Sequence, residues 1–179
     1  MPIENERKFV LKDAAKLETA LTATAGVHRG LLHQAYLDVS GMRIREIDGA
    51  HGVRHLFTYK RPVNGQVVEI ETEISREDFE KLSSQCIERL RKVRYSWTDG
   101  VFHWDVDFFK TETGETYFAM AEVEMPEDQR EPPPLPPNLV GHLLATVPAG
   151  DARFASKRLA DPAHAEAMGA AIAATGRID

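Results

Sequence analysis

The sequence predicts an α+β domain built on an eight-stranded antiparallel closed β-barrel, with a charged interior and helices packed outside. Segment after segment alternates charged and apolar residues with period two, which places the charges of each strand on one face. These charges are also sorted, with bases on some strands and acids on others. An open sheet with one wet face remains the alternative, although solvation alone does not sort charges by sign.

The first half of the chain shows strand alternation separated by turn residues. Strands are expected at 3–10, 31–39, 42–47, 53–61 and 67–74. A helix is expected at 12–25, where Ala14, Leu17 and Leu21 lie on one side. Turns rich in Gly, Pro or Asn at 48–52 and 62–65 separate neighbouring strands.

The second half begins with a helix signal and ends in an alanine-rich segment. Ser75 opens a capping-box pattern, and the expected helix carries the apolar stripe Phe79, Leu82, Cys86 and Leu90. Strands at 92–97 and 101–109 meet at the hairpin signal Asp99-Gly100, and the last strand is expected at 117–125. The proline-rich segment 131–137 excludes a helix or a central strand. Helices are expected at 138–146, 151–160 and 161–174.

Composition narrows the classes of function. The chain has 179 residues, a net charge of -6 and a pI of about 5.7, which argues against a nucleic-acid partner. Cys86 is the only cysteine, so an intrachain disulfide and a Cys-rich metal site are excluded. No apolar stretch is long enough to span a bilayer and no secretory signal is apparent, so we expect a cytoplasmic protein without a membrane partner. A homodimer remains open.

The charged faces define the candidate site. The bases are Lys8, Arg43, Arg45, Lys60, Lys92 and Arg94, and the acids are Glu4, Glu6, Glu69, Glu71, Glu73, Asp105, Asp107, Glu122 and Glu124. A closed barrel lined by these residues would bind a polyanion through its bases and a divalent cation through its acids. Arginine forks and lysine charges suit phosphate oxygens. Carboxylates without His or thiolate ligands suit hard cations, which favours Mg²⁺ or Mn²⁺.

A set of motifs recurs along the chain in a fixed order. Glu4-x-Glu6-x-Lys8 is followed by Gln34-Ala35-Tyr36-Leu37, Arg43-Ile44-Arg45, Thr58-Tyr59-Lys60, Glu69-x-Glu71-x-Glu73, Lys92-Val93-Arg94-Tyr95, Asp105-Val106-Asp107, Glu122-Val123-Glu124 and Asp151-Ala152-Arg153-Phe154. This ordered set resembles the CYTH superfamily, also called triphosphate tunnel metalloenzymes. Asn5 stands where the family usually has Ile, and Phe154 where it has Tyr. The resemblance implies a CYTH-type tunnel domain over 1–160, with 161–179 as its C-terminal helical tail.

The resemblance also implies roles for single residues. The triphosphate would be bound by Lys8, Arg43, Arg45, Lys60, Lys92, Arg94 and Arg153, of which Arg153 is equally well explained as a surface charge. Metal would be held by Glu4, Glu6, Glu122 and Glu124, with Glu71, Glu73, Asp105 and Asp107 supporting it or holding a second ion. Lys60, Glu122 and Glu124 are the candidate catalytic residues. Tyr36 either pairs with Lys60 inside the tunnel or simply packs.

The family contains several activities, and the expected one is metal-dependent hydrolysis of tripolyphosphate or a similar small triphosphate. Class IV adenylate cyclases carry a His-Phe pair shortly before the first motif, whereas only Met1-Pro2-Ile3 stand there in this sequence. A cyclase is therefore the second interpretation. A triphosphate- or polyphosphate-binding module without turnover is the third.

Overall fold

The computed structural model describes residues 5–64 and 66–178, and these form a sheet of nine antiparallel strands with helices around it. The strands are β1 (Glu6–Leu11), β2 (His28–Leu37), β3 (Met42–Gly49), β4 (Gly52–Val63), β5 (Gln66–Glu73), β6 (Cys86–Asp99), β7 (Phe102–Lys110), β8 (Thr116–Glu124) and β9 (Leu143–Thr146). The helices are α1 (Ala14–Thr22), α2 (Arg76–Ser83), α3 (Pro137–Val140), α4 (Ser156–Leu159) and α5 (Pro162–Thr175), with a 3-10 turn η1 (Ala152–Phe154).

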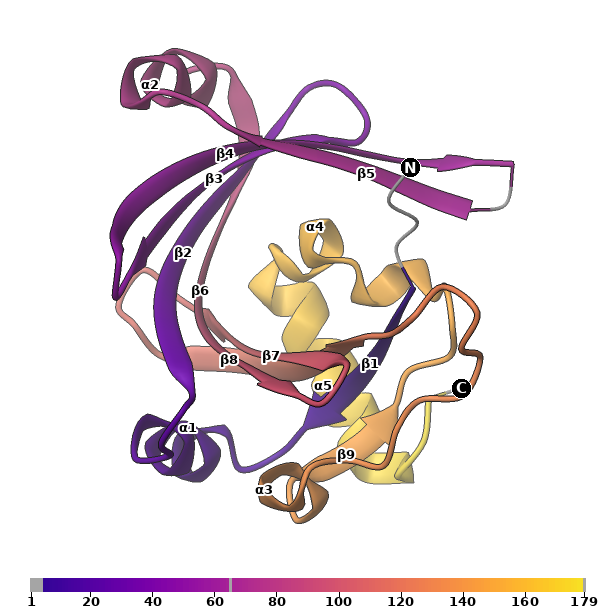
Figure 1. Ribbon diagram of the computed structural model, residues 1–179. Helices are drawn as coiled ribbons and strands as arrows, with labels where there is room; N and C mark the ends of the chain where they lie inside the picture. Colours follow the sequence, from indigo (N-terminus) through magenta and orange to yellow (C-terminus); the bar gives the residue numbers. More distant parts are fainter. Residues whose placement is uncertain (1–4, 65, 179) are drawn as a thin grey trace.

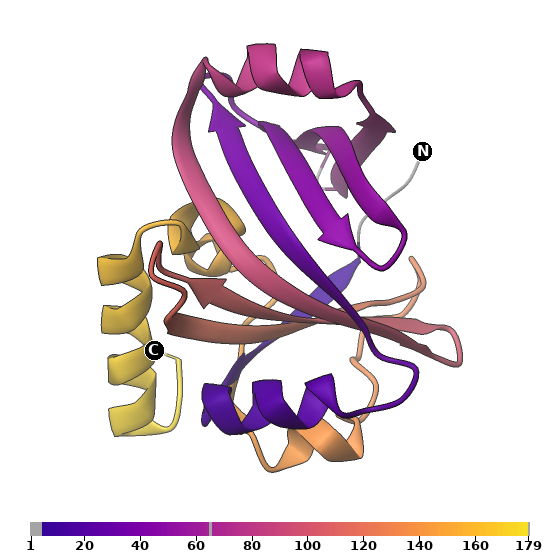
Figure 2. The same cartoon turned by 90° about the vertical axis from the view of Figure 1, so that its left-hand side faces the viewer.

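The sheet is curled into a trough. Its strand order is β5-β4-β3-β2-β6-β7-β8-β1-β9. The long central strands β2 and β6 bend, so that β3–β5 form one wall and β7, β8 and β1 form the other (Figure 1). The segment from η1 to α4 lies at one end of this trough, while α5 runs along the outside (Figure 2).

The predicted closed eight-stranded barrel is wrong. Among the described residues, no ladder joins β5 to β1 or β9, so the sheet has two ends. The hydrogen-bonding edge of β1 that would close the ring is occupied by β9, and Val147 N also donates to Lys8 O at 2.9 Å. The two walls meet instead through side chains, with Lys60 Nζ on β4 lying 4.0 Å from Glu6 Oε1 on β1. Charge pairing, rather than a backbone ladder, spans the gap.

The strand β9 comes from a segment that was predicted to be a helix. Only Pro137–Val140 is helical, and Gly141 follows as the C-cap. The next residues, Leu143–Thr146, pair with the exposed edge of β1. Backbone groups on that edge need partners, and this tertiary demand overrides the helical pattern of 138–146.

A second helix was predicted too long. The helix after Ser75 begins as expected, because the Ser75 side chain accepts a hydrogen bond from Asp78 N. It ends at Ser83, and Cys86 and Leu90 belong to β6. The paired register of β6 with β2 extends to Leu37↔Cys86, so cross-strand pairing decides the structure of this stretch. The predicted helices at 12–25 and 161–174 are confirmed as the shorter α1 and as α5.

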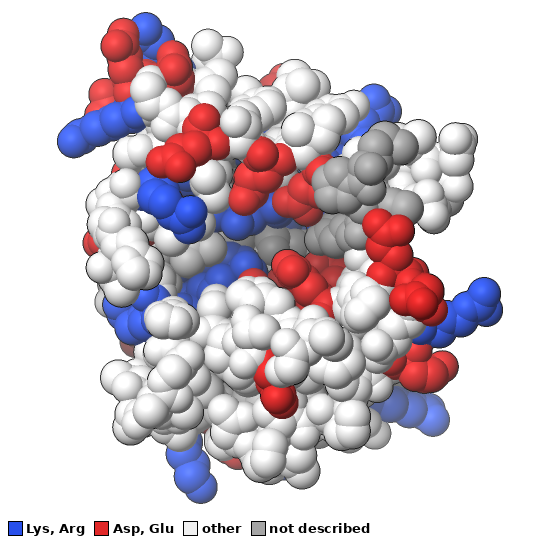
Figure 3. All heavy atoms as spheres, in the orientation of Figure 1, with Lys and Arg blue, Asp and Glu red and all other residues white. Residues whose placement is uncertain are grey.

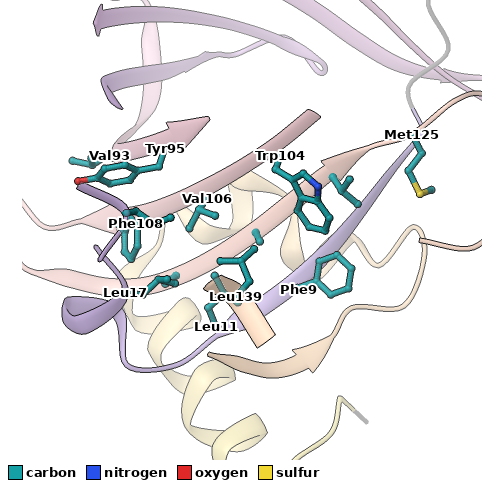
Figure 4. Close-up of a cluster of buried hydrophobic side chains, with 14 residues drawn as sticks. Phe9, Leu11, Leu17, Val93, Tyr95, Trp104, Val106, Phe108, Met125 and Leu139 are labelled. Atoms are coloured by element: carbon teal, nitrogen blue, oxygen red, sulfur yellow. The ribbon is translucent and has the colours of Figure 1, made fainter. Parts of the chain in front are cut away.

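The apolar face of the wall formed by β7, β8 and β1 provides most of the main core. Trp104, Val106 and Phe108 point away from the charged face and are at most 1% exposed (Figure 4). Leu17 of α1 and Leu139 of α3 pack against them (Figure 4). The outer face of the wall formed by β3–β5 is less well covered by other elements, since Ile70 on β5 is 56% exposed. No helix among the described residues is long and apolar enough to cross a membrane.

The packing of α3 gives a test of this architecture. Leu139 is completely buried whereas its neighbour Val140 is 60% exposed. We expect Leu139→Ala to lower the free energy of unfolding by about 2–5 kcal/mol because it leaves a cavity in the main core. Val140→Ala is the matched control and should change it by less than about 0.5 kcal/mol. Urea denaturation of both variants measures this, and equal stabilities would contradict the packing.

Candidate functional site

The trough contains a pocket of about 730 Å³. Among the described residues, seven basic and six acidic side chains line it. The bases are Lys8, Arg43, Arg45, Lys60, Lys92, Arg94 and Lys157, and the acids are Glu6, Glu69, Glu71, Asp105, Glu122 and Glu124. Figure 3 shows a hollow in this face, with basic atoms inside it and acidic atoms along its edge. The pocket walls are therefore close to neutral before anything binds.

The two arginines on β3 each lie beside a glutamate of β5. Arg43 Nη2 donates to Glu69 Oε1 at 2.8 Å, and Arg45 Nη1 lies 4.0 Å from Glu71 Oε2. Burial and the neighbouring Arg43 and Arg94 charges lower the pKa of Arg45 to about 10, so it still carries its charge at neutral pH. Arg43 Nε is buried without a hydrogen-bond partner in the described structure. This N–H group and the crowded charges would both gain from an anion.

A glycine fixes the position of Lys60 on β4. Lys60 N donates to Gly41 O at 2.8 Å. Gly41 has φ +84°, and a Cβ there would lie 2.3 Å from Lys60 O. Only glycine fits this approach, because any side chain would strike the backbone of the neighbouring strand.

The bases on β6 are held by a buried carboxylate. Asp107 is completely buried, and its Oδ2 accepts from Lys92 Nζ at 2.5 Å and from Arg94 Nη2 at 2.6 Å. Arg94 Nε also donates to Asp107 Oδ1 at 2.7 Å, so both oxygens of this carboxylate bind one edge of the guanidinium. Burial and Arg94 lower the pKa of Lys92 to about 8, although Asp107 opposes this shift. Asp107 thus aims two bases at the pocket without reaching its surface.

The neighbouring acid Asp105 holds the same arginine. Arg94 Nη1 donates to Asp105 Oδ2, and Ser96 Oγ donates to Asp105 Oδ1 at 2.5 Å. Burial raises the pKa of Asp105, but Arg94, His103 and Ser96 outweigh it and bring the value to about 2. Asp105 is therefore ionised, and its two oxygens accept hydrogen bonds from Arg94 and Ser96.

Glu122 and Glu124 lie two residues apart on β8 but have opposite surroundings. Glu122 pairs with Lys8 at 3.1 Å and with Arg94 at 3.3 Å. Burial alone would raise the pKa of Glu122, yet Lys8 and Arg94 hold it well below its usual value. The side chain of Glu124 forms no hydrogen bond or ion pair with any described residue. Burial raises its pKa, helped by the negative charges of Asp105 and Glu6 against an opposing effect of His103.

Glu124 and the neighbouring Glu6 form a pair of carboxylates that fits a hard divalent cation. Glu6 on β1 is the direct cross-strand partner of Glu124 on β8, and both line the pocket. Over residues 5–64 and 66–178, no three His, Cys, Asp or Glu side chains come close enough to form a complete metal site. Mg²⁺ is usually held by one or two carboxylates together with substrate phosphates and water, so this pair suffices on the protein side.

The structure brings most predicted residues together, but three of the described ones lie outside the pocket surface. Glu4 lies outside the described residues, Asp107 lies beneath the surface, and Glu73 is exposed on β5. Arg153 has a half-exposed side chain that donates to Asp151 Oδ2 at 2.7 Å. Only the sequence motif pointed to Arg153, and the residue that reaches the pocket from this segment is Lys157.

Sequence reasoning missed the pocket base Lys157 and gave no ligand role to Glu69. Alternation placed Glu69 on the charged face with Glu71, and the structure pairs it with Arg43 at the pocket. Tyr36 lines the pocket and hydrogen-bonds with Gln34 rather than with Lys60. Lys157 lies on a four-residue helix, where no strand periodicity marks it.

The buried carboxylate gives a stability test of the site. We expect Asp107→Asn to lower the free energy of unfolding by about 3–5 kcal/mol, because it removes the charge that compensates buried Lys92 and Arg94. Asp99→Asn, at an exposed hairpin, is the control and should have little effect. Thermal and urea unfolding of both variants provide the comparison. An Asp107→Asn protein as stable as the wild type would show that Lys92 and Arg94 do not depend on this carboxylate.

Comparison with solved structures supports the fold. The inorganic triphosphatase NE1496 is 24% identical, with a TM-score of 0.51 over 89% of this chain and 95% of that chain. The PH1819 protein from Pyrococcus horikoshii OT3 is 16% identical, with a TM-score of 0.54 over 71% of this chain and 80% of that chain. A comparison with curated protein sequences finds no match. At these identities the likeness concerns the fold.

The family model of the CYTH domain matches residues 2–136. This range holds eight of the nine strands, β1 to β8, and every pocket base except Lys157. The charged strand faces predicted from the alternation are the faces that line the pocket. The chain belongs to the CYTH domain family.

Proposed function

We propose that the chain hydrolyses tripolyphosphate or a similar small triphosphate in this pocket, with Mg²⁺ or Mn²⁺. The observation that carries the proposal is the convergence of six bases from four strands on one pocket. A fold neighbour being an inorganic triphosphatase also supports it. Phosphoryl transfer requires mainly positioning and neutralisation of charge, which such a pocket can supply.

The bases have distinct parts in this proposal. Arg43, Arg45 and Arg94 offer planar N–H pairs to phosphate oxygens, and the buried Arg43 Nε would obtain an acceptor. Lys8, Lys60 and Lys92 add point charges around the chain of phosphates. Most of these bases are already paired with carboxylates, so their side chains are held in place before the substrate arrives.

The near-neutral pocket also explains the need for a cation. A triphosphate carries several negative charges, whereas the described walls hold seven bases against six acids. A divalent cation held by Glu6 and Glu124 would supply the missing positive charge next to the phosphates. Glu122, by contrast, is engaged in orienting Lys8 and Arg94.

One assay separates the three interpretations. Phosphate release is measured from tripolyphosphate, ATP and thiamine triphosphate with Mg²⁺ or Mn²⁺, and nucleotide products are separated by chromatography. Phosphate released from tripolyphosphate supports the proposal. Cyclic AMP with pyrophosphate identifies a cyclase, and binding without any product identifies a binding module.

The contrast between Glu122 and Glu124 leads to a metal-dependent prediction. We expect Glu124→Gln to lower the turnover with Mg²⁺ at least about 100-fold, equivalent to ~2.7 kcal/mol. The same change should raise the melting temperature without metal, because it removes the repulsion from Asp105 and Glu6. Glu115→Gln, on an exposed loop, is the control. Wild-type turnover in Glu124→Gln would remove Glu124 from the site.

The lowered pKa of Lys92 leads to a pH-dependent prediction. The pKa of Lys92 is about 8 in the protein without ligand. The Lys92 side chain therefore loses its positive charge as the pH rises through that value. A bound polyanion favours the charged form, so the Kd for tripolyphosphate should rise by about tenfold between pH 7 and 9.5. Lys92→Met should lack this component and show only the ionisation of the ligand. Parallel profiles for the two proteins would contradict the prediction.

A further inference from the structure

Two residues of β2 that have no role so far lie among the pocket bases. Gln34 is 1% exposed and pairs in register with Arg45, while Tyr36 is 7% exposed and pairs with Arg43. Tyr36 lines the pocket. It belongs to none of the three apolar clusters of the protein, unlike Tyr95, which lies in the main core. Packing alone therefore does not account for the position of Tyr36.

The hydrogen bonds around Gln34 fix the direction of each donor. Arg45 Nε donates to Gln34 Oε1 at 3.1 Å. An arginine side chain has no acceptor, so the carbonyl oxygen of the amide must face it. The amide nitrogen of Gln34 then faces Tyr36 and donates to its Oη. Tyr36 is consequently the acceptor in this bond.

This arrangement leaves the phenol proton of Tyr36 available. Within the described structure, the Gln34 bond is the hydrogen bond that Tyr36 Oη forms, and no acceptor receives its proton. Burial raises the pKa of Tyr36 to about 12, so the phenol is a neutral donor at physiological pH. Unlike the pocket bases, it needs no carboxylate partner that a ligand would have to displace.

We propose that the Tyr36 hydroxyl donates a hydrogen bond to a phosphate oxygen of the substrate, and that Gln34 is a positioning residue for both Tyr36 and Arg45. This inference rests on the proposed triphosphate substrate. Arg43 and Arg45 lie on the paired strand beside Tyr36 and Gln34, so the same phosphate group can meet a charged fork and a neutral donor. Lys157 Nζ lies 5.8 Å from the Tyr36 ring centre, which brings the C-terminal segment to this end of the pocket.

The first test removes the hydroxyl and keeps the ring. A non-hydrolysable imido analogue of tripolyphosphate is titrated by calorimetry, with Mg²⁺, into the wild type, Tyr36→Phe and Tyr59→Phe. We expect the Kd of Tyr36→Phe to rise at least about tenfold, as for a lost hydrogen bond to a charged group. Tyr59 lies on β4 outside the described pocket lining, so its variant should match the wild type. Unchanged melting temperatures would show that both variants are folded.

The second test concerns Gln34. Gln34→Glu keeps an acceptor for Arg45 but replaces the donor that faces Tyr36 by another acceptor, which turns the phenol proton away from the pocket. Its added negative charge weakens binding equally in either background. We therefore expect Gln34→Glu to raise the Kd by a larger factor in the Tyr36 protein than in Tyr36→Phe. Equal factors would show that Gln34 does not direct the hydroxyl.

The outcomes distinguish this inference from the function on which it rests. If the wild type binds the analogue and Tyr36→Phe binds it equally well, the role of Tyr36 is refuted and the proposed substrate stands. If the wild type does not bind the analogue, both proposals fail.

Discussion

The carboxylate of Asp107 holds together the charged side of this protein. Lys92 and Arg94 occupy successive inward positions of β6, where their like charges would repel one another in a poorly hydrated space. Asp107 contacts both within 2.7 Å and compensates them. The same principle repeats at Arg43 with Glu69 and at Lys8 with Glu122. Each carboxylate makes it feasible to collect bases on one concave face, and it also fixes their geometry before a ligand binds.

These ion pairs also explain how an open sheet can enclose a pocket. The two walls of the trough are not joined by a ladder, because β9 occupies the free edge of β1. The side chains of Lys60 and Glu6 span the space between the walls instead, and Lys8 donates to the backbone carbonyl of Phe154 at the end of the trough. Both contacts involve bases that line the pocket. A polyanion bound between them would therefore join the same two walls, which couples the shape of the trough to its occupancy.

The sequence predicted the inward faces well because they depend on a local rule. Alternation with period two identified Lys8, Arg45 and Arg94 without knowledge of any long-range contact. Alternation could not predict that the sheet stays open. This depends on the four-residue strand β9, which pairs with the edge of β1, far away in the sequence. For the same reason Cys86 was assigned to a helix, and Lys157 was missed in favour of Arg153. Short segments whose structure is set by their partners carry little signal of their own.

The charge balance of the pocket separates groups that look alike in the sequence. Glu122 and Glu124 belong to one motif, yet the first is engaged by Lys8 and Arg94 while the second stands beside Glu6 and Asp105. The first therefore serves the bases, and the second gains most from an added cation. Tyr36 differs from both because it is neutral and its hydroxyl proton has no acceptor among the described residues. A polyanion entering this pocket would meet paired bases, a carboxylate that favours a metal and a neutral hydroxyl, and each of these contacts has a different dependence on pH and on metal.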